Sequence, residues 1–209
     1  MSGNHEVFPV SRASYLDGWW RRLKYQPGWL VDRYVRPGDT VLDIGCGPGL
    51  FTLPTARRVG ENGQVIAVDL QEGMLEILKE KATQEGLVTR IRFHKAEPQS
   101  LGLEYPGRID IALGLCIVHE VPDPARLMQE VFSLLSPGGT FIIAEPKHEV
   151  PADEFDETLA MAAAAGFYRI GTPFVLRSRT ALFRKDGAGI PCKEKKSAIR
   201  SALVKMIRK

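Results

Sequence analysis

Residues 41–52 read VLDIGCGPGLFT, and this segment carries the strongest structural signal in the sequence. An apolar, strand-like run that contains one acid, Asp43, leads into glycines at positions 45, 47 and 49. Glycine reaches backbone angles that are closed to other residues, and it lets a ligand approach the main chain closely. From Leu50 the pattern turns helical, so free N–H groups at the start of a helix face the same loop. The stretch therefore predicts a strand, a ligand-binding glycine loop and a helix.

The alternation of strand and helix continues along the chain. Short apolar runs rich in β-branched residues predict strands at 40–44, 64–69, 90–94, 109–113 and 140–145. Helical periods predict helices at 51–59, 73–85 and 124–135, the last followed by a turn at 136–139. Beyond residue 145, a helix at 152–165 precedes two strand-like stretches, 167–171 and 174–185, that are close enough to form a hairpin. We expect an α/β fold: a Rossmann-like, doubly wound sheet of about seven strands, mostly parallel with a C-terminal antiparallel hairpin, and helices on both faces.

Composition suggests one main domain with an extension at each end. The chain has 209 residues, 44% of them hydrophobic, which suits a single domain with a sizeable core. We expect an N-terminal helical cap at 1–35, a ligand-binding domain at 36–191 and a basic amphipathic tail at 192–209. All three tryptophans, Trp19, Trp20 and Trp29, lie in the cap. The cap is expected to pack on the core, and the alternative is that it covers a ligand.

Charge and cysteine usage bear on partners and compartment. The tail holds seven Lys/Arg residues against one Glu, so residues 1–191 carry a net charge of −3 and do not look like a nucleic-acid binder. No apolar run approaches the roughly 18 to 20 residues of a membrane span, and the N-terminus lacks a signal-peptide pattern, so a soluble, cytoplasmic protein is expected. Cys46, Cys116 and Cys192 are far apart and odd in number, which argues against disulfides or a CxxC zinc site; no metal is expected.

The acids around the glycine loop indicate the chemistry of the ligand. A dinucleotide-binding loop needs G-x-G-x-x-G, but Leu50 stands where its third glycine would be, and no P-loop Lys follows. Asp43 lies two residues before Gly45, where it would repel phosphate and attract a cation. Asp69 ends the next strand at the same sheet edge, where an acid can accept hydrogen bonds from both ribose hydroxyls. A cationic, phosphate-free ligand with a ribose fits S-adenosylmethionine better than NAD.

Over about residues 36–147 the chain resembles the class I S-adenosylmethionine-dependent methyltransferases. Four segments in order carry the resemblance: VLDIGCGPG, VIAVDLQEGML, RIDIALGLCIVHEVPDP and LLSPGGTFIIAEP. Within that class the chain is most similar to the small-molecule group that includes ubiquinone/menaquinone C-methyltransferases and arsenite methyltransferases. The resemblance implies an enzyme that uses S-adenosylmethionine as its cofactor.

The resemblance also implies roles for particular residues. Gly45, Cys46 and Gly47 would pass under the methionine moiety, which Asp43 would help to hold, and Asp69 would bind the ribose. Other contacts are expected around the adenine or at the end of the fourth strand, from Leu70, Met74, Ala96, Glu97 and Leu115. Relatives commonly have an acid where Lys95 stands, so here Glu97 is expected to bind the adenine amino group. The backbone N–H of Ala96 is expected to donate to the adenine ring.

The acceptor side is less defined. Methyl transfer from a sulfonium is an in-line displacement, which mainly requires alignment and exclusion of water. His119, at the end of the fourth strand, is the candidate catalytic residue because its pKa suits proton transfer. A small-molecule acceptor is the expectation, since the Asp/Asn-Pro-Pro-aromatic motif of amino-methylating enzymes is absent from residues 114–117. The alternatives are arsenite bound by cysteines, RNA bound through the basic tail, or a non-catalytic S-adenosylmethionine-binding protein.

Overall fold

The computed structural model describes residues 9–186, apart from residues 17, 19, 20, 22, 24, 105 and 106. The predicted basic tail, with Cys192, lies outside the described residues, as do Trp19 and Trp20 of the predicted cap.

A seven-stranded sheet forms the centre of the molecule, with the strand order β3-β2-β1-β4-β5-β7-β6. The strands are β1 (Thr40–Ile44), β2 (Gln64–Asp69), β3 (Ile91–Lys95), β4 (Ile109–Leu115), β5 (Leu135–Pro146), β6 (Phe167–Gly171) and β7 (Ser178–Lys185). The first five strands pair in parallel, whereas β7 pairs antiparallel with both β5 and β6. Parallel strands that are buried on both faces read as nearly continuous apolar runs, as β1, β2 and β4 do. The predicted fold class is confirmed.

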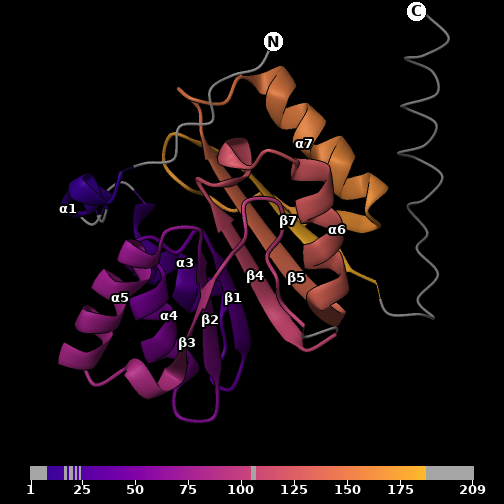
Figure 1. Ribbon diagram of the computed structural model, residues 1–209. Helices are drawn as coiled ribbons and strands as arrows, with labels where there is room; N and C mark the ends of the chain where they lie inside the picture. The colour runs from indigo at the N-terminus through magenta and orange to yellow at the C-terminus, as the bar shows by residue number, and fades with distance from the viewer. Residues whose placement is uncertain are drawn as a thin grey trace, which may run out of the picture.

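Helices cover both faces of this sheet (Figure 1). On one face lie α3 (Pro27–Tyr34), α4 (Thr52–Val59) and α5 (Glu72–Gln84), and on the other lie α6 (Pro124–Leu134) and α7 (Ala152–Ala164). Successive strand residues point to opposite layers: Val41 packs with the first group of helices, and Leu42 with the second. Burial on both sides fixes the register, because a slip of one residue would exchange the two sets.

The N-terminal segment crosses the sheet edge where the parallel strands end. It contains a 3-10 turn (Val10–Arg12) and the short α1 (Ala13–Leu16) ahead of α3. Leu16 lies over the glycine loop, since a β-carbon built on Gly47 would be 3.8 Å from its Cδ1 atom. The side chain of Val10 packs against Gly73 at the start of α5. The segment is therefore placed to close the site described below.

Two local expectations differ from the structure. Residues 136–139, predicted as a turn, belong to β5, where they form an irregularity in the pairing: Leu135 pairs with Ile109, and Thr140 with Ile111. Gly139 fits there because a β-carbon would lie 3.0 Å from the carbonyl oxygen of Ile109. Residues 174–177, predicted as strand, instead belong to the β6–β7 connection, and β7 begins at Ser178.

Candidate functional site

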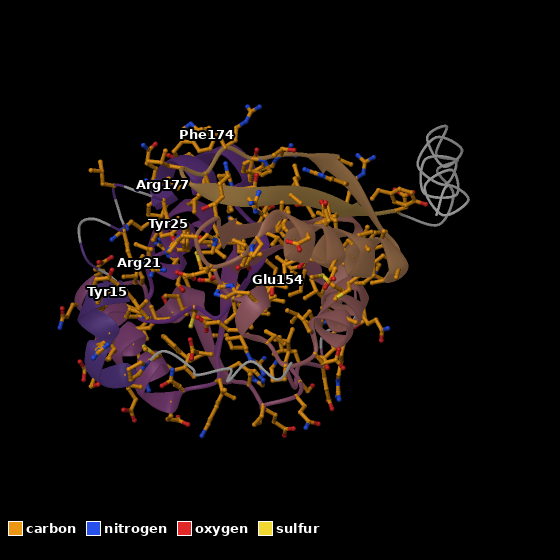
Figure 2. The ribbon with its side chains drawn as sticks, turned by 90° about the horizontal axis from the view of Figure 1, so that it is seen from above. Tyr15, Arg21, Tyr25, Glu154, Phe174 and Arg177 are labelled. Carbon is orange, nitrogen blue, oxygen red and sulfur yellow. The ribbon has the colours of Figure 1, made fainter. Side chains whose placement is uncertain are left out.

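A large cavity of about 1880 Å³ opens at the edge where the parallel strands end. Its walls come from the glycine loop, the ends of β2, β4 and β5, the segment after β3, the N-terminal segment and the β6–β7 connection. Figure 2 shows Tyr15, Arg21 and Tyr25 on the same side of the molecule as Phe174 and Arg177, while Glu154 on α7 lies apart. Ligand pockets commonly measure roughly 300–1,000 Å³, so this cavity has room for two molecules side by side.

The three glycines of the loop meet different needs. All three have positive φ, which favours glycine. A β-carbon on Gly45 would lie 2.6 Å from Ile117 Cδ1, so this glycine lets the loop pack against the segment after β4. At Gly49 it would lie 2.4 Å from Leu78 Cδ1, which shows that this glycine serves the packing of α5. Gly45 and Gly47 both line the cavity, and at Gly47 the nearest such atom is 3.8 Å away, so there is room for a ligand beside its backbone.

Asp69 ties the glycine loop to the end of β2. Its Oδ2 atom accepts a hydrogen bond from the N–H of Gly47 at 2.8 Å, and its Oδ1 atom accepts one from the N–H of Gln71 at 2.9 Å. Burial raises the pKa of Asp69, although the hydrogen bonds from Gln71, Gly47 and Leu70 oppose that shift. The carboxylate lies on the cavity wall and has lone pairs left for the hydroxyls of a ligand.

Asp43 lies behind the loop rather than on the cavity wall. Its side chain is fully buried, and its Oδ2 atom accepts a hydrogen bond from the hydroxyl of Thr52 at 2.5 Å. Burial raises its pKa to about 7, against the effect of the Thr52 hydrogen bond and with a further contribution from the charge of Asp69. Such a carboxyl takes up a proton easily, and a cation bound at the loop would favour its ionised form.

The other predicted cofactor residues, Cys46, Leu70, Met74, Ala96, Glu97 and Leu115, all lie on the cavity wall. Met74 and Leu115 are buried, while Glu97 is exposed. The N–H of Ala96 already donates to the carbonyl oxygen of Asp69 at 2.9 Å, because the parallel pairing of β2 and β3 continues past Lys95. The expected donation from this N–H to an adenine ring is therefore not available in this structure. Lys95 itself forms an ion pair with Glu72 at 3.2 Å.

His119 takes a position different from the one expected. It belongs to the 3-10 turn Val118–Glu120, but its ring is not among the groups that line the cavity. Nδ1 hydrogen-bonds to the buried Glu145 of β5, while Nε2 lies 3.2 Å from Glu149 Oε2. His119 thus stands one layer behind the wall, and it is Glu120 and Glu149 on either side of it that reach the cavity.

Several residues of the site carry little signal in the sequence. Tyr25, buried at the end of the N-terminal segment, interacts with Cys116, and burial together with this contact raises the pKa of its hydroxyl. Cys116 has φ of 60°, an uncommon conformation for a residue with a side chain, at the point where β4 enters the site. The β6–β7 connection, residues 172–177, forms another part of the cavity wall. The sequence predicted a hairpin here but gave no sign that it borders the site. Glu149 follows the recognisable segment LLSPGGTFIIAEP by three residues, and an acid after a strand end was its only signal.

Among the residues that the structure describes, no group of three or more His, Cys, Asp or Glu side chains is arranged to hold a metal ion. Within the same residues, every helix is too short or too polar to cross a membrane.

Comparison with known proteins points the same way as the geometry. Residues 36–177 match the family model described as a methyltransferase domain. The chain is 32% identical over 130 residues to a ubiquinone/menaquinone biosynthesis C-methyltransferase from Marinomonas sp., an alignment that covers 59% of this chain and 50% of that protein. It is 35% identical over 102 residues to a ubiquinone biosynthesis O-methyltransferase from Leptothrix cholodnii, covering 49% and 42% respectively. The chain spans about half the length of the curated relatives it matches.

Among solved structures, the fold resembles a SAM-dependent methyltransferase from Aquifex aeolicus. The TM-score is 0.76 with 24% sequence identity, and the match covers 85% of this chain and 98% of that one. At this identity the likeness concerns the fold alone. The predicted enzyme class and its cofactor, S-adenosylmethionine, are confirmed by the family. From its sheet, its glycine loop and these matches, the chain belongs to the S-adenosylmethionine-dependent methyltransferase family.

Proposed function

We propose that this protein transfers the methyl group of S-adenosylmethionine, by in-line displacement, to a small-molecule acceptor with an apolar body. The observation that carries the proposal is the continuity of the cavity: it begins at Gly47 and Asp69 and ends at an apolar rim. The cofactor would occupy the first part, with the ribose on Asp69, and the acceptor the second.

Part of the cavity rim is apolar. Four large hydrophobic side chains that line the cavity are exposed, and Tyr15 and Phe174 reach 69% exposure each. The other two are Leu23 and Leu176. Exposed apolar side chains at the mouth of a cavity are typical of a binding site for an apolar group. The two curated relatives described above are named for ubiquinone or menaquinone biosynthesis, which supports an aromatic acceptor of quinone type.

Displacement at a sulfonium methyl requires the acceptor atom, the methyl carbon and the sulfur to lie in line. The segment after β4 packs against the glycine loop, where Ile117 lies against Gly45. We place the methionine end of the cofactor at this loop and the acceptor between it and the apolar rim. Buried side chains on the cavity wall, Met74 and Leu115 among them, limit the access of water, which would otherwise compete as a nucleophile.

The test is methyl transfer from S-adenosylmethionine labelled in its methyl group. The purified chain would be offered 1,4-naphthohydroquinone and catechol under anaerobic conditions, and an RNA transcript in parallel. We expect the labelled methyl group to appear in one of the phenolic compounds and not in RNA. Label in RNA alone would favour a nucleic-acid methyltransferase, and the Asp69→Ala variant serves as the control that lacks the ribose ligand.

A further inference from the structure

The carboxylate of Glu145 organises the turn that follows β4. Glu145 is 1% exposed, and its Oε1 atom accepts hydrogen bonds from the N–H groups of Ile117 and Val118 at 3.3 and 2.9 Å. Its Oε2 atom bonds to Nδ1 of His119. These hydrogen bonds hold the Glu145 carboxylate in place, and through it they fix the orientation of the His119 ring from the β5 side.

The other side of the His119 ring faces two more acids. Nε2 lies 3.2 Å from Glu149 Oε2 and 4.0 Å from Glu120 Oε1. Burial lowers the pKa of His119, but the hydrogen bond and charge of Glu145, with the charges of Glu120 and Glu149, outweigh it and raise the pKa above its ordinary value. A neutral ring would turn its Nε2 lone pair toward two carboxylates, so the arrangement favours the imidazolium.

Glu149 connects this cluster to the cavity. It lies on the cavity wall with its side chain 47% exposed. Its Oε1 atom is 2.8 Å from Nε2 of His148, so the carboxylate is held between two imidazole rings. The charge of Glu149 also acts on Tyr25, which lines the same cavity. The neighbouring imidazole rings fix the position of Glu149, and as a residue of the cavity wall it can reach a bound acceptor.

We propose that Glu149 takes the proton of the methyl acceptor and that His119 is the residue that positions it. This inference rests on the proposed function and narrows it to acceptors whose reacting atom carries a proton, such as a phenolic hydroxyl. In the step, the acceptor O–H proton passes to the Glu149 carboxylate while an oxygen lone pair forms the new O–C bond. The bond from the methyl carbon to sulfur breaks, and its electron pair stays on sulfur, which leaves neutral S-adenosylhomocysteine. Proton transfer by a positioned side chain contributes about 10² to 10⁴ in rate.

Glu120 is the competing carboxylate on the same wall. Burial raises its pKa; the charge of His119 opposes that shift, and the charges of Glu145, Glu149 and Asp69 reinforce it. Glu120 Oε1 lies 4.0 Å from Nε2 of His119, whereas Glu149 Oε2 lies 3.2 Å from it. His119 therefore holds Glu120 less firmly than Glu149. Substitution separates the two acids, because each can be changed without the other.

The experiment uses the full chain, labelled S-adenosylmethionine, and 1,4-naphthohydroquinone and catechol as probes, with trimethylamine as an acceptor that has no proton to lose. Glu149→Gln is expected to lower kcat by about 100-fold or more, with KM for the probe changed by less than about threefold. His119→Asn keeps a donor for Glu145 and loses Nε2, so it is expected to lower kcat by about tenfold. In the wild type we expect the rate to fall at alkaline pH, where the His119 imidazolium loses the proton that holds Glu149 in position, and His119→Asn should lack this fall. Glu154→Gln, an exposed acid on α7 outside the cavity, is the matched control and should leave kcat unchanged.

Three results would overturn the inference: full turnover in Glu149→Gln, loss of turnover in Glu120→Gln instead, or wild-type transfer to trimethylamine but not to the phenolic probes. Failure of the proposed function looks different, because the wild type would then bind no S-adenosylmethionine or transfer methyl to no acceptor. Calorimetric binding of S-adenosylmethionine to each variant shows whether the site is still folded. Nitrogen-15 NMR of the His119 ring tests the cluster without an acceptor: Glu149→Gln should lower the imidazole pKa, and an unchanged value contradicts the contact.

Discussion

The carboxylate of Asp69 accepts a hydrogen bond from the N–H of Gly47 at 2.8 Å, so the acid at the end of β2 and the glycine loop after β1 form one unit. The same acid would bind the ribose and set the shape of the loop. Substitutions here should therefore affect binding through both routes.

Asp69→Ala is expected to weaken binding of S-adenosylmethionine and S-adenosylhomocysteine alike by more than about tenfold, or about 1.4 kcal/mol, because both share the ribose. Asp69→Asn, which keeps an oxygen for Gly47, should lose less. Isothermal titration calorimetry measures all three proteins. Equal affinities for wild type and Asp69→Ala would refute the ribose assignment.

The burial of Asp43 predicts an effect on stability. Its pKa in the folded chain is about 7, above the value of 3.8 for an unfolded chain, so the folded state binds more protons between those pH values. The contribution of Asp43 to stability is therefore present below pH 3.8 and is lost as pH rises through 7. At pH 8, Asp43→Asn should raise the free energy of unfolding by about 2 to 4 kcal/mol, and by much less at pH 5. Urea denaturation at the two pH values checks this, and a variant that is less stable at both would contradict it.

The same residue should make cofactor binding depend on pH. If the ionised Asp43 attracts the cationic methionine end, the affinity of the wild type for S-adenosylmethionine should rise as pH passes through about 7. Asp43→Asn should bind S-adenosylmethionine about tenfold more weakly at pH 8 and lose that dependence. Titrations at pH 6 and pH 8 provide the comparison. A pH dependence retained in Asp43→Asn would assign it to another group.

A side chain introduced at Gly49 should destabilise the protein more than one introduced at Gly38, a glycine with a similar backbone conformation. Gly49 and Gly38 have φ of 98° and 90°, but a β-carbon would lie 2.4 Å from Leu78 at Gly49 and meet nothing within 4 Å at Gly38. Gly38→Ala should cost about 1 kcal/mol of stability from backbone strain alone. Gly49→Ala should cost about 1 to 3 kcal/mol more, since Leu78 is fully buried and must move. Thermal unfolding of both variants measures the difference, and equal losses would mean that packing of α5 does not require this glycine.

Much of the fold could be predicted because it is encoded locally. β1, β2 and β6 have the expected bounds, since apolar, β-branched runs and flanking glycines define them without reference to the rest of the chain. The start of β7 and the role of residues 136–139 depend on how β5 pairs with its neighbours. That pairing is a property of the assembled sheet, so the sequence pattern alone did not show it.

The placement of the candidate site residues could likewise be predicted only in part. The positions of Gly47 and Asp69 at one sheet edge were predictable, because Asp69 ends one strand, Gly47 follows another, and the resemblance to the family implies that these strands are neighbours. The position of His119 behind the wall was not, because it depends on Glu145, which lies 26 residues away on the neighbouring strand. Glu149 and the β6–β7 connection join the site only through the three-dimensional packing of β5 and β7.

We propose that the glycine loop and Asp69 bind an adenosyl cofactor whose other end is cationic and free of phosphate. Isothermal titration of the purified chain with S-adenosylmethionine, S-adenosylhomocysteine and NAD decides between this assignment and a dinucleotide site. We expect micromolar binding of the two adenosyl ligands and no binding of NAD. Binding of NAD, or no binding of either adenosyl ligand, would show that the glycine loop has been misread.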